Sequence, residues 1–196
     1  MTKLFSIKKY LEEASDLTNK LTSLNSDIIN FSNNLANIIF NNKKIIFCGN
    51  GGSAAHAQHL SAELLVRLRK NFKRKALPGI TLALDTSTIT ACGNDFSFDE
   101  IFSRSLEGIG MEGDALFAIS TSGQSKNILK AIDIAKEKKI KVFSLIGNDG
   151  GIQHPLSDYS LIVPSNNTAH IQEAQICLGH IIMYLIEDNL KEKSFI

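Results

Sequence analysis

Apolar positions along the first part of the chain recur at steps of three and four. The series runs through Leu4, Ile7, Leu11, Leu17, Leu21, Leu24, Ile28, Phe31, Leu35, Ile38 and Ile39. Because an α-helix has about 3.6 residues per turn, this spacing gathers the apolar side chains on one helical face. The pattern predicts an N-terminal helical arm over residues 1–41, with one break or bend.

After this arm, short apolar runs alternate with further helical spacing. The segment KKIIFCGNGG predicts a strand ended by glycines, and more strands are predicted near residues 79–84, 114–120, 141–147 and 160–165. Helical spacing lies between most of them, at residues 53–69, 99–109 and 126–138. This alternation favours a doubly wound, Rossmann-like α/β fold, whose mainly parallel five-stranded sheet is covered by helices on both faces. Ligands are expected at the carboxyl ends of the strands.

The last part of the chain is again helical. Residues 168–192 predict one long helix, with a broad apolar face formed by Ile171, Ile176, Leu178, Ile181, Ile182, Leu185 and Ile186. A long helix at each end suggests packing between subunits, so we expect the terminal helices to serve oligomerisation. Neither a linker nor an internal repeat is evident, and residues 1–196 are expected to form a single domain.

Composition narrows the choice of partners. A net charge of +1 with 21 % charged residues gives no general attraction to nucleic acid or to anionic membranes. No run of about 18 apolar residues occurs, and acidic residues near the start do not fit a secretory signal. We expect a cytoplasmic protein with neither nucleic-acid nor membrane partners. The widely spaced Cys48, Cys92 and Cys177 indicate neither a disulfide framework nor a cysteine zinc site.

Two segments share one design, in which a predicted strand ends in small polar residues and a helix begins. They are Asn50-Gly51-Gly52-Ser53 and STSGQS at residues 120–125. Free backbone N–H groups and the positive end of a helix dipole suit a phosphate, and hydroxyl groups add donors without charge. Neither segment has a full G-x-G-x-x-G pattern or a P-loop ending, which disfavours a nucleotide. The alternative for STSGQS is a simple helix cap and turn.

The helix after the first of these loops carries a polar stripe. His56, His59 and Glu63 are spaced by three and four residues, so they line one face. A histidine and a carboxylate four residues apart can share a metal ion or divide the roles of acid and base. The alternative is the solvated face of an ordinary amphipathic helix.

Three other histidines are less easily interpreted. His180 interrupts the apolar run ICLGHIIMYLI, where a lone histidine is more often a hydrogen-bonded core residue than a functional group. His154 and His170 have no comparable neighbours. They are expected on the surface.

Five blocks, in order along the chain, together resemble the phosphoheptose isomerases (sedoheptulose-7-phosphate isomerases) of the sugar-isomerase (SIS) superfamily. They are CGNGGSAAHAQHLSAELLVR, TACGNDFSFDEIFSR, GDALFAISTSGQSKNILKAI, LIGNDGG and TAHIQEAQICLGH, and the match extends from about residue 10 to 190. The resemblance implies conversion of sedoheptulose 7-phosphate to D-glycero-D-manno-heptose 7-phosphate through an ene-diol. In the family this is the first step towards the activated heptose of bacterial lipopolysaccharide or capsule.

The resemblance also implies a role for particular residues. Sugar-phosphate contacts are implied for Asn50, Gly51, Gly52, Glu63, Asn94, Asp95, Ser120, Thr121, Ser122, Ser125 and Gln172. Glu63 is implied as the catalytic base and His180 as the acid. One zinc ion per subunit of a homotetramer is implied on His59, Glu63, Gln172 and His180. An isomerase needs such groups, because one must take a proton beside the carbonyl and another must protonate an oxygen of the ene-diol.

The spacing of Gln172 and His180 adds a structural expectation. Eight residues of a straight helix span roughly 12 Å, which is too far for two ligands of one ion. We therefore expect interface active sites, at which Gln172 and His180 come from different subunits. His180 is expected from the neighbouring subunit.

His56 departs from the family pattern, because many relatives have an acidic residue three positions before the helix histidine. This leaves open an isomerase of another sugar phosphate. A non-catalytic SIS protein that binds a sugar phosphate, or that associates with a replication initiator, is a further alternative. Such a protein would not need both Glu63 and His180.

Overall fold

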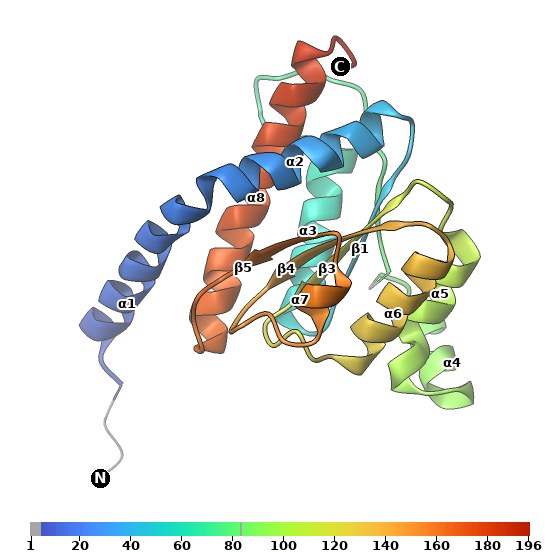
Figure 1. Ribbon diagram of the computed structural model, residues 1–196, viewed down its shortest axis with the longest axis horizontal. Helices are drawn as coiled ribbons and strands as arrows, with labels where there is room; N and C mark the ends of the chain where they lie inside the picture. The colour runs from blue at the N-terminus through green and yellow to red at the C-terminus, as the bar shows by residue number, and fades with distance from the viewer. Residues whose placement is uncertain (1–4, 83) are drawn as a thin grey trace.

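The computed structural model describes residues 5–82 and 84–196 (Figure 1). These residues form one parallel sheet of strand order β2-β1-β3-β4-β5. The strands are β1 (Ile45–Gly49), β2 (Gly79–Thr81), β3 (Ala115–Ser120), β4 (Lys141–Ile146) and β5 (Tyr159–Ile162). The predicted α/β class, the number of strands and their parallel direction are therefore confirmed. Leu4 of the predicted arm and Ala83 of the second predicted strand lie outside the described residues.

Helices precede, connect and follow the strands. They are α1 (Ile7–Lys20), the 3-10 turn η1 (Leu21–Leu24), α2 (Asn25–Phe40), α3 (Gly52–Leu65), α4 (Thr86–Asp95), the 3-10 turn η2 (Phe98–Glu100), α5 (Ile101–Ile109), α6 (Lys126–Glu137), α7 (Gln153–Leu156) and α8 (Thr168–Glu192). The predicted arm is confirmed as α1 and α2, and its predicted break is η1. The predicted C-terminal helix is confirmed as α8.

The apolar spacing does not predict α4 or α7. Helix α4 begins with the segment TSTIT, whose β-branched residues have low helix propensity. Its first turn is stabilised by Asp85, whose carboxylate accepts hydrogen bonds from the backbone N–H groups of Ser87 and Thr88. Helix α7 has four residues, too few to show a periodic pattern.

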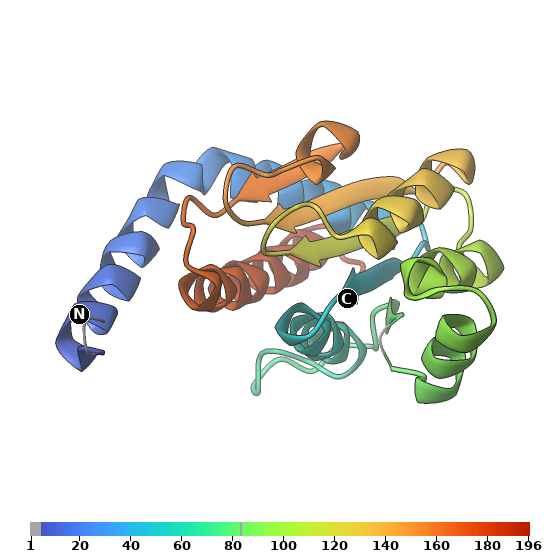
Figure 2. The same cartoon turned by 90° about the horizontal axis from the view of Figure 1, so that it is seen from below.

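Helices cover both faces of the sheet (Figure 2). In β1, Ile45 and Phe47 belong to a core shared with α2, α3 and α8, whereas Ile46 and Cys48 belong to a core shared with α5 and α6. Successive side chains of a strand point to opposite faces, so a strand buried on both sides reads as a continuous apolar run. Burial raises the pKa of the Cys48 thiol to about 12, which agrees with a structural role for this cysteine.

The carboxyl ends of β1 and β3 lie at the point where the strand order changes direction. Open α/β sheets bind ligands outside such a point. Two contacts support the end of β3: Gly147 donates its N–H to the carbonyl of Ser120 at 3.1 Å, and the side-chain amide of Gln175 on α8 donates to the same carbonyl at 3.0 Å. The loop after β3 is therefore tied both to the loop after β4 and to α8.

Helix α1 projects beyond the sheet and contacts the beginning of α8 (Figures 1 and 2). The hydroxyl of Tyr10 donates to Glu173 at 2.6 Å, and the rings of Tyr10 and His170 lie 4.2 Å apart. His170 is only 4 % exposed, so its predicted surface position is wrong because the arm covers it. His154 is exposed, as predicted.

Within the described ranges, no helix combines the length and the apolar character needed to cross a membrane.

Candidate active site

Helices α3 and α8 carry the predicted proton-transfer and metal-binding side chains. The Nε2 atoms of His59 and His180 lie 2.7 Å apart, and His59 Nε2 is 3.4 Å from Oε1 of Glu63. One ligand atom from each of the three residues lies within 4.8 Å of the other two. The side chains of His59 and Glu63 are 45 % and 16 % exposed, so the cluster is open to solvent on one side.

Two glycines allow α3 and α8 to approach closely. A Cβ atom on Gly179 would lie 2.8 Å from the side chain of Leu60, and one on Gly52 would lie 2.5 Å from the amide nitrogen of Gln172. Since Gly52 meets Gln172 and Leu60 meets Gly179, the two helices run in the same direction. This packing places His59 opposite His180, next to the contact of Gly179.

The cluster forms within one chain, so the prediction that a neighbouring subunit contributes His180 is wrong. The close packing of α8 on α3, which the spacing along the sequence does not reveal, brings His180 to His59 of its own chain. Gln172 lies elsewhere, against the first residue of α3. Seven residues, roughly 10 Å of helix, separate Gly52 from His59. This agrees with the expectation that Gln172 and His180 of one chain do not share an ion.

The first predicted phosphate loop joins β1 to α3 through a tight turn. Gly51 has a φ of 54°, in the region that favours glycine. The backbone N–H of Ser53 donates to the carbonyl of Asn50 at 2.9 Å, which closes the turn. The loop therefore presents its glycines at the N-terminus of α3, as predicted.

The side chain of Asn50 forms a reciprocal amide pair with Asn127 of α6. Asn50 Nδ2 donates to Asn127 Oδ1 at 2.9 Å, and Asn127 Nδ2 donates to Asn50 Oδ1 at 2.8 Å. Each amide keeps one further N–H, so Asn50 is held in place while it can still donate to a ligand. The pair connects the two predicted phosphate loops.

Asn127 is a site residue that sequence reasoning missed. It is 2 % exposed and occupies the same buried face of α6 as Ala131 and Ala135. A polar amide in an otherwise apolar stripe, just after the loop STSGQS, is the signal that could have identified it.

The hydroxyl groups of the second loop divide into two sets. Ser120 Oγ accepts a hydrogen bond from the N–H of Gly123 at 2.9 Å, and Ser122 Oγ accepts one from Gln124 at 3.3 Å. Ser125 precedes α6, but its side chain forms no capping hydrogen bond. The interpretation as a simple turn and cap thus accounts for Ser120 and Ser122 and leaves the hydroxyl of Ser125 for a ligand.

Asn94 and Asp95 lie at the end of α4, on the other side of the sheet from α3 and α8. Both are exposed, and the amide of Asn94 donates to the carboxylate of Asp95 at 2.8 Å. Their contact with a sugar phosphate stays a prediction.

A family model for the SIS domain matches residues 9–147. The chain is 44 % identical over 188 residues to a phosphoheptose isomerase of Sulfurimonas denitrificans, covering 96 % of this chain and 92 % of the relative. It is 49 % identical over 149 residues to one from a Nitratiruptor species, covering 76 % and 79 %. The solved structure of a phosphoheptose isomerase from Francisella tularensis has a TM-score of 0.87 at 34 % identity, covering 96 % and 100 %.

The chain belongs to the phosphoheptose isomerase family. The predicted resemblance and the predicted SIS fold are thereby confirmed, and the chain is an enzyme of the aldose–ketose isomerase class.

The cluster of His59, Glu63 and His180 suits a divalent metal ion. Two imidazoles and one carboxylate are the ligand types of a catalytic zinc site that keeps an open position. His59, Glu63 and His180 offer this set, with their ligand atoms close enough to reach one ion. The donors therefore fit the metal that the family resemblance implies.

His56 lies one turn before His59 on the same helix. Its pKa is lowered, because burial disfavours the charged imidazolium and because His59 and His180 add repulsion. In the part of the chain that the structure describes, its Nδ1 atom is buried without a hydrogen-bond partner. The neutral form of the His56 imidazole is therefore favoured at this position.

Proposed function

We propose that the cluster and the two loops form an active site that interconverts sedoheptulose 7-phosphate and D-glycero-D-manno-heptose 7-phosphate. The observation that carries the proposal is the meeting of His59, Glu63 and His180 on α3 and α8. Helix α3 itself begins in a predicted phosphate loop, so one element connects the binding part of the site to the reactive part. The relatives named above support this substrate.

The reaction moves a carbonyl from C2 of the ketose to C1 of the aldose. Glu63 takes a proton from C1, which forms the ene-diol, and returns it to C2. His180 donates a proton to the oxygen on C2 as that carbonyl is lost, and it takes one from the oxygen on C1 as the new carbonyl forms. A positioned acid or base of this kind contributes roughly 10²- to 10⁴-fold in rate.

The loops would hold the phosphate at the far end of the sugar. The donors proposed for this are Asn50, Gly51, Gly52, Ser120, Ser122 and Ser125, and the other proposed substrate contacts are Asn94, Asp95, Thr121 and Gln172. Binding at the phosphate anchors the sugar in the site, with C1 and C2 near Glu63.

Zinc is the proposed metal, with one ion per subunit. His59, Glu63 and His180 of one chain would hold it, and Gln172 of the partner subunit would complete the site. Glu63 and His180 would bind the ion only in states in which they do not carry a proton. When bound, the ion supplies positive charge that stabilises negative charge on the sugar oxygens.

A homotetramer with active sites at its interfaces is the proposed assembly. An apolar groove of about 380 Å³ runs between the arm and α8, and it is lined by Thr18, Leu21, Thr22, Asn25, Ile28, Ile29, Cys177, Ile181 and Leu185. Apolar surface of this kind is typical of contacts between subunits. Light scattering should show an oligomer, and a fully active monomer would contradict this proposal.

The proposed place of the reaction is the cytoplasm, in the synthesis of heptose for lipopolysaccharide or capsule. The net charge of +1 supports the proposal that neither nucleic acid nor a membrane is a partner.

The decisive experiment compares three ketose and aldose phosphates. The zinc-loaded protein is incubated with sedoheptulose 7-phosphate, fructose 6-phosphate or arabinose 5-phosphate, and the isomeric product is followed by chromatography. We expect conversion of the heptose phosphate at least tenfold faster than of the others. A preference for another sugar would change the substrate, and no turnover of any would favour the non-catalytic binding protein.

A further inference from the structure

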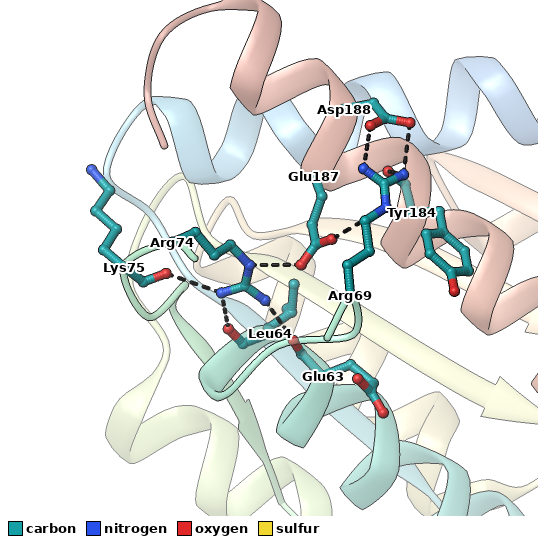
Figure 3. A network of polar contacts seen from close by, with 8 residues as sticks. All are labelled: Glu63, Leu64, Arg69, Arg74, Lys75, Tyr184, Glu187 and Asp188. Carbon is teal, nitrogen blue, oxygen red and sulfur yellow. Dashed lines mark hydrogen bonds and ion pairs between the residues drawn. The ribbon is translucent and has the colours of Figure 1, made fainter. Parts of the chain in front are cut away.

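A buried ion pair lies next to the cluster, between the ends of the two helices that carry it (Figure 3). Arg74 comes from the segment between α3 and β2, and its Nε donates to Oε1 of Glu187 on α8 at 2.6 Å. The two side chains are 0 % and 1 % exposed. A charge pair removed so completely from water stays paired only where the surrounding structure fixes its geometry.

The same guanidinium binds the C-terminal end of α3. Its Nη2 donates to the backbone carbonyl of Glu63 at 2.6 Å, and its Nη1 donates to that of Leu64 at 2.8 Å. The last carbonyls of a helix have no partner within the helix, and a positive charge there is favourable. Arg74 therefore joins the backbone of the proposed catalytic base directly to α8.

The position of Glu187 on α8 makes this connection relevant to His180. Seven residues separate Glu187 from His180, which is two helical turns, so both side chains leave α8 on nearly the same face. Gly179 packs against Leu60 beside the cluster, and on the other side of the cluster Gly52, at the start of α3, lies against Gln172. The separation of α3 and α8 is thus fixed on both sides of the His59–Glu63–His180 cluster.

A second arginine, Arg69, also contacts the carboxylate of Glu187. Nε of Arg69 lies 3.8 Å from Oε2 of Glu187, and its Nη2 donates to the neighbouring Asp188 at 2.8 Å (Figure 3). The Arg69 guanidinium also lies 4.8 Å from the ring centre of Tyr184, and its hydrogen bond lowers the pKa of Asp188. The carboxylate of Glu187 is therefore held between two guanidinium groups, of which only that of Arg74 reaches α3.

We propose that Arg74 and Glu187 are positioning residues, which set the separation and register of α3 and α8 and thereby place Glu63 and His180 for proton transfer and metal binding. Catalytic and metal-binding groups must be held to within about 0.5 Å, and the helices that carry them need support of this kind. The proposal rests on the proposed function of the cluster.

The test uses variants that remove the pair without leaving a lone charge. Arg74→Met alone would take from the buried carboxylate of Glu187 its hydrogen-bonded partner and leave only the more distant Arg69, which is destabilising. The double variant Arg74→Met/Glu187→Leu removes both charges and keeps most of the volume. Arg74→Lys keeps the charge but loses the fork that reaches two carbonyls of α3 and the carboxylate of Glu187 together.

The control is a partly buried ion pair far from the cluster, in which the side chain of Lys44 is 26 % exposed and that of Asp114 is 2 % exposed. Lys44 and Asp114 form an ion pair at 2.5 Å between the amino ends of β1 and β3, at the opposite edge of the sheet from the loops. The control variant is Lys44→Met/Asp114→Asn, in which the asparagine keeps one oxygen, for one of the two backbone N–H groups that the carboxylate of Asp114 binds. It reports the effect of losing an ion pair that does not connect α3 to α8.

Three readouts separate positioning from folding. They are the affinity and visible spectrum of Co²⁺ bound to the metal-free protein, kcat and KM for sedoheptulose 7-phosphate, and the imidazole NMR resonances of His59 and His180 without metal. For Arg74→Met/Glu187→Leu we expect Co²⁺ affinity and kcat to fall at least tenfold, KM to change less than twofold, and the imidazole resonances to shift. Arg74→Lys should lie between this variant and the wild type, and the control should match the wild type.

The proposal is overturned if the folded double variant matches the wild type in all three readouts, or if the control loses as much. A wild type that neither binds Co²⁺ nor turns over the sugar contradicts the proposed function instead. In that case the imidazole resonances still test the positioning role. Unchanged resonances of His59 and His180 in the double variant overturn it, and shifted resonances support it.

Discussion

The two loops at residues 50–53 and 120–125 are held by contacts between neutral groups. Helices α3 and α8, the helix pair that carries the cluster, are joined by charged groups as well as by close packing. The loops are held by backbone hydrogen bonds, by serine hydroxyls and by the amide pair of Asn50 and Asn127. The helix pair is held by close packing at Gly179 and by the ion pair of Arg74 and Glu187. A phosphate site needs many weak donors around an anion, while proton transfer needs a few groups in fixed positions.

This difference leads us to expect separable kinetic effects. Changes in the loops should alter mainly KM, because the phosphate is bound equally in the ground state and the transition state. Changes in the helix pair should alter mainly kcat, because Glu63 and His180 act on atoms that change during the reaction. Each prediction below tests one side of this comparison.

The largest effect is expected for Glu63→Gln in the helix pair. Glutamine keeps the shape of the side chain but cannot take a proton, so kcat should fall by about 10³-fold. KM should stay within about twofold because the loops are unchanged. Steady-state kinetics with added zinc measures both values, and Glu192→Gln, on the exposed end of α8, is the control. A variant that keeps a tenth of the wild-type kcat would remove Glu63 as the base.

The next effect is expected for Asn127→Leu, which removes both hydrogen bonds from Asn50. Two neutral hydrogen bonds contribute about 1–2 kcal/mol together, so KM should rise roughly tenfold with little change in kcat. Calorimetric titration with the sugar phosphate should show the same loss, and Co²⁺ affinity should not change.

Two further variants check the reason for that loss. Asn127→Asp should raise KM more than leucine does, because it adds a negative charge beside the phosphate loops. Asn34→Leu removes a comparable amide, one that accepts a hydrogen bond from Tyr159 at 3.0 Å far from the loops, and should leave KM unchanged. A fall in kcat with constant KM for Asn127→Leu would show that Asn127 supports proton transfer and not phosphate binding.

A smaller effect, on stability, is expected for Gly179→Ala. Alanine is favoured over glycine in a helix by up to about 1 kcal/mol. The added Cβ, however, would lie 2.8 Å from the side chain of the fully buried Leu60, and overpacking of this kind costs about 1–3 kcal/mol. The cost of overpacking should exceed the gain in helix propensity by about 1 kcal/mol. The variant should therefore show a lower midpoint of urea unfolding. Gly108→Ala, where the added Cβ meets nothing within 4 Å, should instead be neutral or stabilising.

The two regions also differ in how far the sequence could predict them. The loops, and the stripe of His59 and Glu63, depend on residues a few positions apart, so glycines, hydroxyls and helical spacing identify them directly. The five strands were predictable for the same reason, since each is one short apolar run. Helix α4 was not, because its β-branched residues obscure the helical pattern and its start depends on one capping residue, Asp85.

The helix pair depends on contacts between residues far apart in the sequence. His59 meets His180 across 121 positions, and Arg74 meets Glu187 across 113. Nothing in the segment RLRKNFKRK distinguishes Arg74, whose side chain is buried, from the other basic residues around it. The spacing of Gln172 and His180 correctly separated these two residues along α8, but it could not show which of them packs against His59 of the same chain.

The smallest effect is expected for Ser122→Ala in the second loop. The hydroxyl of Ser122 accepts a long hydrogen bond, 3.3 Å from the N–H of Gln124, so its loss should change stability little. If this hydroxyl also donates to the phosphate, KM should rise about two- to fivefold with kcat unchanged. Ser120→Ala should have a larger effect on stability, because Ser120 is buried and accepts at 2.9 Å from Gly123. Ser105→Ala on α5 is the control for loss of a hydroxyl outside the loops. A fall in kcat for Ser122→Ala with KM unchanged would show that this loop also positions the reacting carbons.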